Sequence, residues 1–580
     1  MKIQNKHNKL LFLILALAIF LRTVFLDRLP AGISNDEYYF ILSSKNVFFD
    51  LINLFKGGWD SQIFQNIVKT VNSETSILLM APILGLLPST LFYARIPYVF
   101  IGVITIFLIY KITLKNTKNI NLSLLIALIA AINPWSIYVN RTSFDAPVAL
   151  LFFVLTIYLQ SFSNYKYILL SAVSSYLAFN GYIGTKVIYL PFMLITSIYS
   201  WKVLHHRKYT KSFIFTIIFS IVVTLSFLLK LSSSSIGNRR SELIFPSSPQ
   251  ISSQVNDERR QSIQTSYLPV FSNKYTIYFR NFIDKYLYNF STDILFLNGD
   301  HTFMVSLWRM GYFYYLDFLL LIIGIIYLFN HHRNFLIFLV SLILLSPIPE
   351  SIRADNIPSY AFHSSFQYPF LYIIIGSGAY YLWSLLKVKS LKLAFAIAYI
   401  FLFFNFLDIY FNKYPVYQPE GFSTSRYLLA NYIKHEQEKT PNIYVVTSEP
   451  EAIFRNYIYL TKQYNIQNIS SIKNQYLLHP DSRYFQWANI TISDQVPSGK
   501  DSDTTYIFDS SITNFPFSLE THLAITHLGD AREIYKIYSS QSCQNLSLST
   551  YVSNLKTKDL KFTSLSETDF CQKYISSRQN

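Results

Sequence analysis

Two adjacent acidic residues, Asp36 and Glu37, follow the first long apolar run of the chain and stand between Asn35 and Tyr38-Tyr39. A carboxylate in such a setting can act as a general base, and a pair of carboxylates can hold a divalent metal ion. The alternative is a solvated loop without a chemical role. Because polar residues beside membrane-sized apolar runs are costly, this pair is the first candidate for a reacting group.

Several cations lie at the ends of other apolar runs, on what we expect to be the same side of a membrane. They are Arg95, Arg141, Lys186, Arg239 and Arg240, with Asp145 four residues after Arg141. Each cation alone could be a snorkelling side chain at the lipid headgroups, and Arg141 could pair with Asp145. As a set they predict a site for an anionic group, such as a phosphate that arginine binds bidentately.

Motifs for nucleotide-driven or hydrolytic chemistry are missing from the sequence. We find no P-loop, dinucleotide-binding, nucleophile-elbow or HExxH pattern, and only 16 of the 580 residues are glycine. A reaction at the membrane surface would then need a donor that arrives already activated, and a lipid phosphate meets that need.

The composition indicates a membrane protein. Hydrophobic residues make up 51% of the chain and charged residues 14%, while Lys+Arg 49 against Asp+Glu 33 gives a net charge of +16. Average proteins carry about 25% charged residues, so disorder and an ordinary soluble enzyme are both disfavoured. The cations form short clusters between apolar runs, with no continuous stripe of the kind that binds nucleic acid.

The elements that must position the candidate residues are apolar runs long enough to cross about 30 Å of hydrocarbon. About eleven are expected: 10–26, 94–112, 121–138, 146–162, 166–180, 187–203, 213–231, 313–330, 334–348, 367–386 and 392–411. The first run could be a signal peptide, but no small-residue cleavage site follows it, which favours a retained span.

The connectors between these runs alternate in character. Those at 111–119, 164–166, 201–211, 330–334 and 387–392 are short and basic, whereas those at 27–93, 139–145, 232–312 and 349–366 hold most of the acidic residues. By the positive-inside rule the N-terminus is inside and the C-terminus outside a multi-pass cell membrane. Asp36 and the outer cations would then share the extracytoplasmic face.

A composition change near residue 412 predicts two domains, a membrane module over 1–411 and an extracytoplasmic α/β domain over 412–580. The second has β-rich runs at 442–448, 484–493, 504–510 and 533–540 and a helix-like run at 425–439. The only two cysteines, Cys543 and Cys571, lie there. Outside the cytoplasm a disulfide between them is expected, the alternative being two unrelated thiols.

The order of several segments resembles a known family. These segments are LPAGISNDEYYF, YARIPYVFIG, INPWSIYVNRTSFDAP, LAFNGYIGTK, LFLNGDHTF and IPESIRADNIPSYAFHSS. Over about residues 8–411 they are similar to the C-type (GT-C) glycosyltransferases, and to the bacterial branch of glycosyltransferase family 39, relatives of protein O-mannosyltransferases and the lipid A aminoarabinose transferase. The resemblance implies an all-α polytopic membrane protein of GT-C type.

The resemblance also implies an activity: transfer of a single sugar, with inversion, from a polyprenyl-phosphate donor to a protein, lipid or glycan acceptor outside the cytoplasmic membrane. Asp36 would be the catalytic base, with Glu37 beside it in the acidic motif. The substrate-binding residues expected from the resemblance and the outer cations together are Arg95, Arg141, Asp145, Tyr182, Lys186, Arg239, Arg240, Asp300 and His363.

Departures from the family pattern keep other functions open. Lys186 stands where the family usually has arginine, and the arginines expected after Asp300 and beyond IPSY are missing, with His363 nearest to the second position. A flippase or transporter of lipid-linked sugars and an inactive membrane scaffold are therefore alternatives. We expect no obligatory metal, although Asp36 and Glu37 could hold a divalent ion, and we expect the bilayer but no nucleic acid as a partner.

Overall fold

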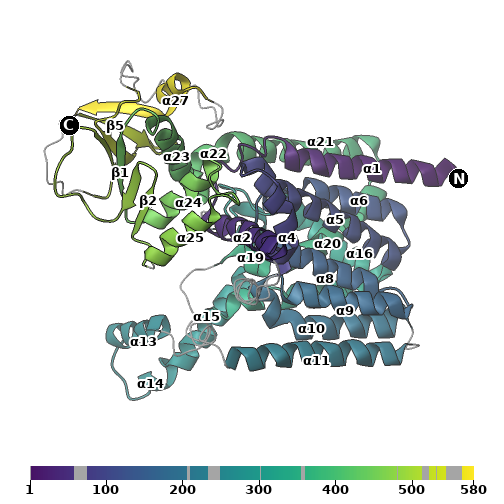
Figure 1. Ribbon diagram of the computed structural model, residues 1–580. Helices are drawn as coiled ribbons and strands as arrows, with labels where there is room; N and C mark the ends of the chain where they lie inside the picture. The colour runs from purple at the N-terminus through teal and green to yellow at the C-terminus, as the bar shows by residue number, and fades with distance from the viewer. Residues whose placement is uncertain are drawn as a thin grey trace.

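A helical bundle and a smaller α/β domain make up the computed structural model (Figure 1). It describes residues 2–57, 75–205, 209–232, 249–300, 302, 304–353, 359–479, 481–512, 521–530, 532–543 and 565–579. The β-sheet lies beyond one end of the bundle, and the N-terminus of the chain lies at the opposite end (Figure 1).

Each apolar run that the sequence predicts to cross the membrane falls on a helix of the bundle. These helices are α1 (Lys2–Thr23), α5 (Leu91–Thr117), α6 (Ile120–Ile132), α8 (Ala146–Gln160), α9 (Tyr165–Phe179), α10 (Ile183–Tyr199), α11 (Thr210–Ser232), α16 (Tyr315–His331), α17 (Arg333–Leu345), α20 (Tyr368–Leu385) and α21 (Lys389–Asp408). Among the described residues, 5 helices are long and apolar enough to cross a membrane, and four other apolar helices are shorter. These helices support a membrane protein, whereas the count of about eleven spans and the orientation stay predictions.

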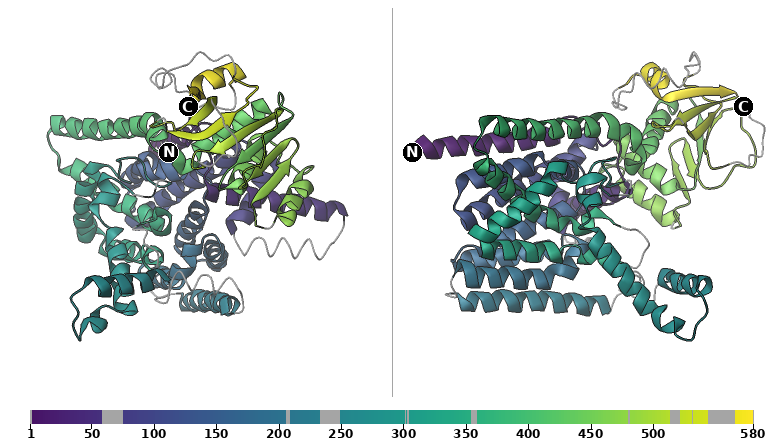
Figure 2. Two further views of the ribbon diagram at one scale, coloured as in Figure 1. Left: turned by 90° about the vertical axis from the view of Figure 1, so that its left-hand side faces the viewer. Right: turned by 180° about the vertical axis from the view of Figure 1, so that it is seen from behind.

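Short elements gather at the end of the bundle nearest the sheet. α2 (Asn35–Gly57) packs on α4 (Thr75–Leu86), and α2 runs across the bundle rather than along it (Figure 2, left). The other connecting elements are α7 (Pro134–Val139), η2 (Asp293–Leu297), α18 (Ile348–Ser351), α19 (Ala361–Ser364) and η3 (Ser365–Gln367). The connector between α11 and α16 also forms an arm that projects from the bundle (Figures 1 and 2), made of α13 (Pro249–Gln261), α14 (Leu268–Phe271) and α15 (Lys274–Tyr288).

The C-terminal domain follows three short turns of helix, η4 (Ile409–Lys413), α22 (Tyr414–Tyr417) and η5 (Pro419–Phe422). It contains α23 (Thr424–Glu436), β1 (Asn442–Val446), α24 (Pro450–Leu460), α25 (Ile469–Leu478), β2 (Tyr484–Trp487), β3 (Ile490–Ser493), β4 (Thr504–Asp509), β5 (Thr521–Thr526), β6 (Glu533–Tyr538), α27 (Glu567–Tyr574) and β7 (Ile575–Gln579). The sheet order is β2-β3-β1-β4-β6-β5-β7, in which β1 is parallel to β3 and β4 and the other pairs are antiparallel.

One β-rich run differs from its predicted form. The run over 484–493 is a tight antiparallel hairpin, in which Trp487 faces Ile490 and Ala488 has a φ of 52°. A residue in the left-handed region reverses the chain within two residues, and an alanine there gives no sequence signal for the turn.

The two cysteines form a disulfide that joins the end of the β6 loop to α27. Their Cα atoms are 5.5 Å apart. The loop before Cys543 is held by the buried Glu436 carboxylate, which accepts hydrogen bonds from the backbone N–H groups of Gln541 and Ser542, both at 2.8 Å. These hydrogen bonds lower the pKa of Glu436 even though burial opposes them.

Two glycines let α16 and α20 approach closely in the centre of the bundle. A Cβ added to Gly324 would overlap the carbonyl of Ile374, and one added to Gly378 would overlap the carbonyl of Leu320. Each glycine therefore lies against the backbone of the facing helix, as small residues do where membrane helices pack tightly.

We expect Gly378→Ala to destabilise the protein by about 1–3 kcal/mol, since a methyl group cannot be placed there without separating the helices. This loss exceeds the gain of roughly 1 kcal/mol that alanine brings to a helix interior. Thermal unfolding in detergent measures the change. Gly499→Ala is the matched control because nothing lies within 4 Å of its added Cβ. Equal unfolding temperatures for the two variants would contradict the close contact.

Candidate functional site

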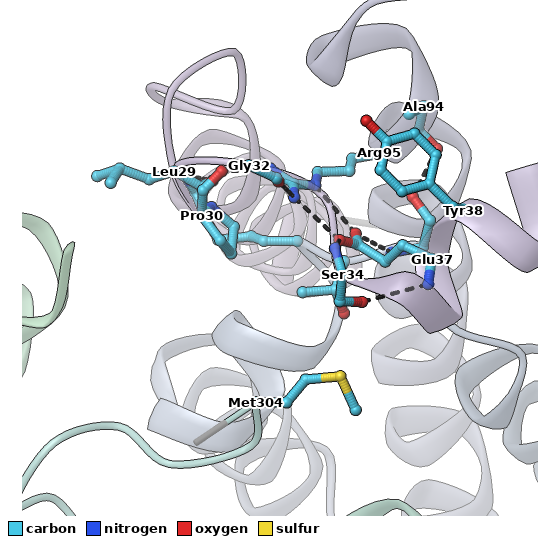
Figure 3. A network of polar contacts seen from close by, with 12 residues as sticks. Leu29, Pro30, Gly32, Ser34, Glu37, Tyr38, Ala94, Arg95 and Met304 are labelled. Carbon is cyan, nitrogen blue, oxygen red and sulfur yellow. Dashed lines mark hydrogen bonds and ion pairs between the residues drawn. The ribbon is translucent and has the colours of Figure 1, made fainter. Parts of the chain in front are cut away.

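Glu37 is fixed inside the protein by its place in α2. Ser34 precedes the helix and accepts a hydrogen bond from the Glu37 N–H at 3.2 Å, while Glu37 Oε2 accepts from the Ser34 N–H at 3.1 Å. This reciprocal pair is a capping box, which the sequence Ser34-Asn35-Asp36-Glu37 encodes. The side chain of Glu37 is fully buried and points to Arg95 (Figure 3).

Arg95, on the second turn of α5, binds both oxygens of Glu37. Its Nε and Nη2 each lie 3.1 Å from one carboxylate oxygen, and its Nη1 donates to the Pro30 carbonyl at 2.7 Å. Nη2 also donates to the carbonyl of Gly32. Glu37 Oε1 accepts a further bond from the Ser143 N–H at 2.9 Å. Both side chains are 0% exposed.

These contacts bear on two expectations, which stay predictions. Glu37 was expected to be catalytic, yet both of its oxygens are occupied by protein donors. Arg95 was expected to bind substrate, yet its guanidinium is occupied by Glu37 and two carbonyls. We therefore assign the pair to holding the loop before α2 against the bundle.

Arg141 is likewise used within the protein. Its guanidinium is fully buried and donates to the carbonyls of Leu21 (3.1 Å), Val24 (2.8 Å) and Leu29 (3.1 Å), and to the Tyr410 hydroxyl (3.1 Å). The first two carbonyls belong to the last turn of α1 and the residue that follows it, where the helix dipole favours a cation. These contacts give Arg141 a structural role, and the substrate-binding role expected for it stays a prediction.

Asp36 points away from this buried network. It is exposed, and its Oδ2 accepts a hydrogen bond from the Tyr360 hydroxyl at 3.1 Å. Desolvation by the surrounding protein raises the pKa of the Asp36 carboxyl, and the nearby Glu37 charge adds to this, while the Tyr360 hydrogen bond opposes it. The result is an accessible carboxylate with a raised pKa, which suits a general base.

Tyr360 joins Asp36 to a group of polar side chains from the connector before α20. The Arg353 guanidinium lies 5.9 Å from the centre of the Tyr360 ring, and the His363 ring centre lies 5.2 Å from it. His363 Nδ1 is 2.5 Å from the Tyr182 hydroxyl. Burial raises the pKa of Tyr182 well above its ordinary value, so the phenol keeps its proton in this contact. Base, cation and aromatic rings thus meet at one end of the bundle.

Asp300 supports the segment that carries Tyr360 and His363. Its Oδ2 accepts from the Ala361 N–H at 2.9 Å and its Oδ1 from the Thr302 N–H at 2.8 Å. The carboxyl is nearly fully buried, and burial raises its pKa. Its place is therefore behind the site, not at the surface that a substrate would reach.

Of the remaining expected residues, Asp145 is buried at the start of α8 and raises the pKa of both Tyr182 and Tyr360, which places it close to the same group. Lys186 lies on the first turn of α10, with its Nζ 5.5 Å from the Phe227 ring. Arg239 and Arg240 lie outside the described residues.

Three contributors escaped the sequence analysis: Tyr360, Arg353 and the buried Arg22, which caps the end of α6 by donating to the Ala131 carbonyl at 2.9 Å. The signal for Tyr360 and Arg353 was the polar outer connector IPESIRADNIPSYAFH. The signal that Glu37 is structural was the capping-box spacing.

A metal ion at Asp36 and Glu37 would have to displace Arg95. Within the described part of the chain, no group of three or more His, Cys, Asp or Glu side chains could hold a metal ion. The expectation that no metal is obligatory stays a prediction.

Comparison with known proteins gives little further guidance. No family model matches the sequence, and no curated protein matches it. Among solved structures, the crystal structure of ArnT from Cupriavidus metallidurans bound to undecaprenyl phosphate is similar at 11% identity and a TM-score of 0.42, over 91% of this chain and 97% of that one.

We expect Glu37→Gln to lower the free energy of unfolding by about 3–5 kcal/mol, because it leaves the buried Arg95 without a counter-charge. Thermal unfolding in detergent measures this. Asp27→Asn is the matched control: Asp27 is 57% exposed and its pair with Arg28 is worth at most about 1 kcal/mol. An unfolding temperature of Glu37→Gln equal to that of the control would show that the pair does not hold the loop.

Proposed function

We propose that the protein is a GT-C-type membrane glycosyltransferase, which moves one sugar from a polyprenyl-phosphate donor to an acceptor outside the cytoplasmic membrane. The observation that carries this proposal is the accessible Asp36 carboxylate, hydrogen-bonded to Tyr360, whose ring lies beside the Arg353 guanidinium. A base and a cation that both lie beside one tyrosine match a reaction that removes a proton and releases an anion.

In this mechanism Asp36 takes the proton of the acceptor hydroxyl or amine as the acceptor atom attacks the anomeric carbon of the sugar. The bond between that carbon and the phosphate oxygen breaks, and the lipid phosphate leaves with the electron pair. The raised pKa of Asp36 supports this role, because a base whose pKa lies closer to the working pH accepts the proton more readily.

The leaving phosphate gains negative charge, which a cation at fixed distance stabilises. We assign this task to Arg353 and Lys186. Arg353 lies beside Tyr360, the partner of Asp36, and its Nη1 also forms an ion pair with the buried Glu350 at 3.2 Å. Lys186 lies on the first turn of α10, four positions after Tyr182, the residue that precedes this helix.

A direct displacement with inversion needs one working carboxylate. Retaining mechanisms use a second carboxylate as nucleophile about 5 Å from the first. Glu37, the neighbour of Asp36, cannot take that role while Arg95 and two backbone N–H groups occupy it. This arrangement supports inversion.

The place of the site suits a donor that is carried in the membrane. Asp36 begins a helix that crosses the end of the bundle (Figure 2, left), and the apolar helices of the bundle end beneath it. A polyprenyl chain could remain among lipids while its phosphate and sugar reach Asp36.

We expect Asp36→Asn to lower kcat by about 10²–10⁴-fold, the usual contribution of a general base. The measurement is sugar transfer from a labelled polyprenyl-phosphate donor in membranes that hold equal amounts of each variant. Asp27→Asn makes the same chemical change on an exposed carboxylate nearby and should leave kcat unchanged. Wild-type turnover by Asp36→Asn would refute the mechanism, and donor binding without transfer by the unmodified protein would favour an inactive scaffold.

A second expectation concerns pH. The base must be ionised, so kcat should fall as the pH drops through the raised pKa of Asp36. Tyr360→Phe removes the hydrogen bond that lowers this pKa, and the acid limb of the kcat profile should therefore move to higher pH. A profile of kcat against pH for the two proteins tests this, and an unmoved or lowered acid limb would exclude Asp36 as the titrating base.

A further inference from the structure

The C-terminal domain packs directly on the helix that carries Asp36. The Tyr38 hydroxyl donates to Asn456 Oδ1 at 3.0 Å, and Lys473 Nζ forms an ion pair with Asp50 at 2.6 Å. The backbone of Gly32 also lies so close to the Phe422 carbonyl that an added Cβ would overlap it. Residues far apart in sequence thus enclose the loop before α2 and the first part of that helix.

One residue of this interface reaches the position next to Asp36. Arg426, on the first turn of α23, donates from Nη1 to Asn35 Oδ1 at 3.1 Å. The same nitrogen lies 3.3 Å from the Ser423 hydroxyl, and Nη2 forms an ion pair with Glu449. Glu449 follows β1, so the guanidinium is anchored at the C-terminal ends of the parallel strands β1, β3 and β4.

We propose that Arg426 is a positioning residue for Asp36, which makes the C-terminal domain part of the catalytic unit. This inference rests on the proposed function, in which Asp36 is the base. Arg426 holds Asn35, the first residue of α2, and so fixes the direction in which the next residue presents its carboxylate. Its own charge is balanced by Glu449, and its effect is therefore geometric.

The geometry of arginine suits this task. Its guanidinium is a planar fork that can bind two acceptors at fixed angles, here the Asn35 amide oxygen and the Glu449 carboxylate. A lysine would keep the charge near Glu449 without holding both partners. Small displacements matter at this point, because a misplacement of about 1 Å can cost a reaction 10²-fold.

A purely structural role would give a different result. The domain is also held by the Tyr38–Asn456 and Lys473–Asp50 contacts, so the loss of Arg426 should leave it docked. Lys473→Gln is therefore the control, since it removes an interface ion pair away from Asp36. A general weakening of the interface would affect both variants alike.

The test compares Arg426→Gln, Asn35→Ala, their double variant, Arg426→Lys and Lys473→Gln in the full-length protein. We expect Arg426→Gln and Asn35→Ala each to lower kcat about 10-fold at an unchanged KM and unfolding temperature.

The double variant should be no slower than the slower single variant, because both substitutions remove the same hydrogen bond. Arg426→Lys should recover part of the loss, and Lys473→Gln should keep the wild-type kcat. Wild-type kcat in Arg426→Gln, or losses that multiply in the double variant, would overturn the inference.

A measurement that needs no substrate, hydrogen–deuterium exchange, tests this inference separately from the proposed function. Hydrogen–deuterium exchange of the peptide that spans residues 34–38 should become faster in Arg426→Gln and stay unchanged in Lys473→Gln. Faster exchange in a protein that shows no sugar transfer would refute the proposed function and retain the positioning contact. Unchanged exchange in an active protein would refute the positioning role alone.

Discussion

The buried ion pair of Glu37 and Arg95 is the interaction on which the site depends. Two charges in a low-dielectric interior are tolerated only when each is fully hydrogen-bonded, and here backbone groups of Ser34, Pro30 and Ser143 complete the set. Consecutive residues of a helix point about 100° apart because a turn holds 3.6 residues. Once Glu37 is held inward, Asp36 must face a different direction, toward Tyr360. The capping box, the ion pair and the exposed carboxylate are therefore one arrangement.

The arginines near the site show how charge is used in an apolar protein. Arg22 and Arg141 are fully buried, and both donate to carbonyls at helix ends. Carbonyls at a helix C-terminus carry partial negative charge and would otherwise lack partners. These cations therefore stabilise the packing of α1, α6 and the loops that follow these helices.

The sequence predicts the elements better than it predicts the roles of charged residues. Apolar runs give the helices because length and hydropathy are local properties, and β-rich composition gives β1, β2, β3, β4 and β6 of the C-terminal sheet. Arg95 and Arg141 could not be assigned from the sequence, since their partners are carbonyls that come close only after folding. Asp36 and Glu37 look equivalent until the S-x-x-E spacing is recognised, and Tyr360 reaches Asp36 from 324 positions away in the chain.

The contact between the C-terminal domain and α2 sets an order of events during biosynthesis. Asn35 and Arg426 are 391 positions apart, and Tyr38 and Asn456 are 418 apart. The ribosome makes the loop before α2 long before α23 and α24, so this loop lacks its C-terminal partners until the bundle helices have been synthesised. Such long-range contacts form late in folding. A chain that ends before the C-terminal domain therefore lacks the contacts that Asn35 and Tyr38 make with Arg426 and Asn456.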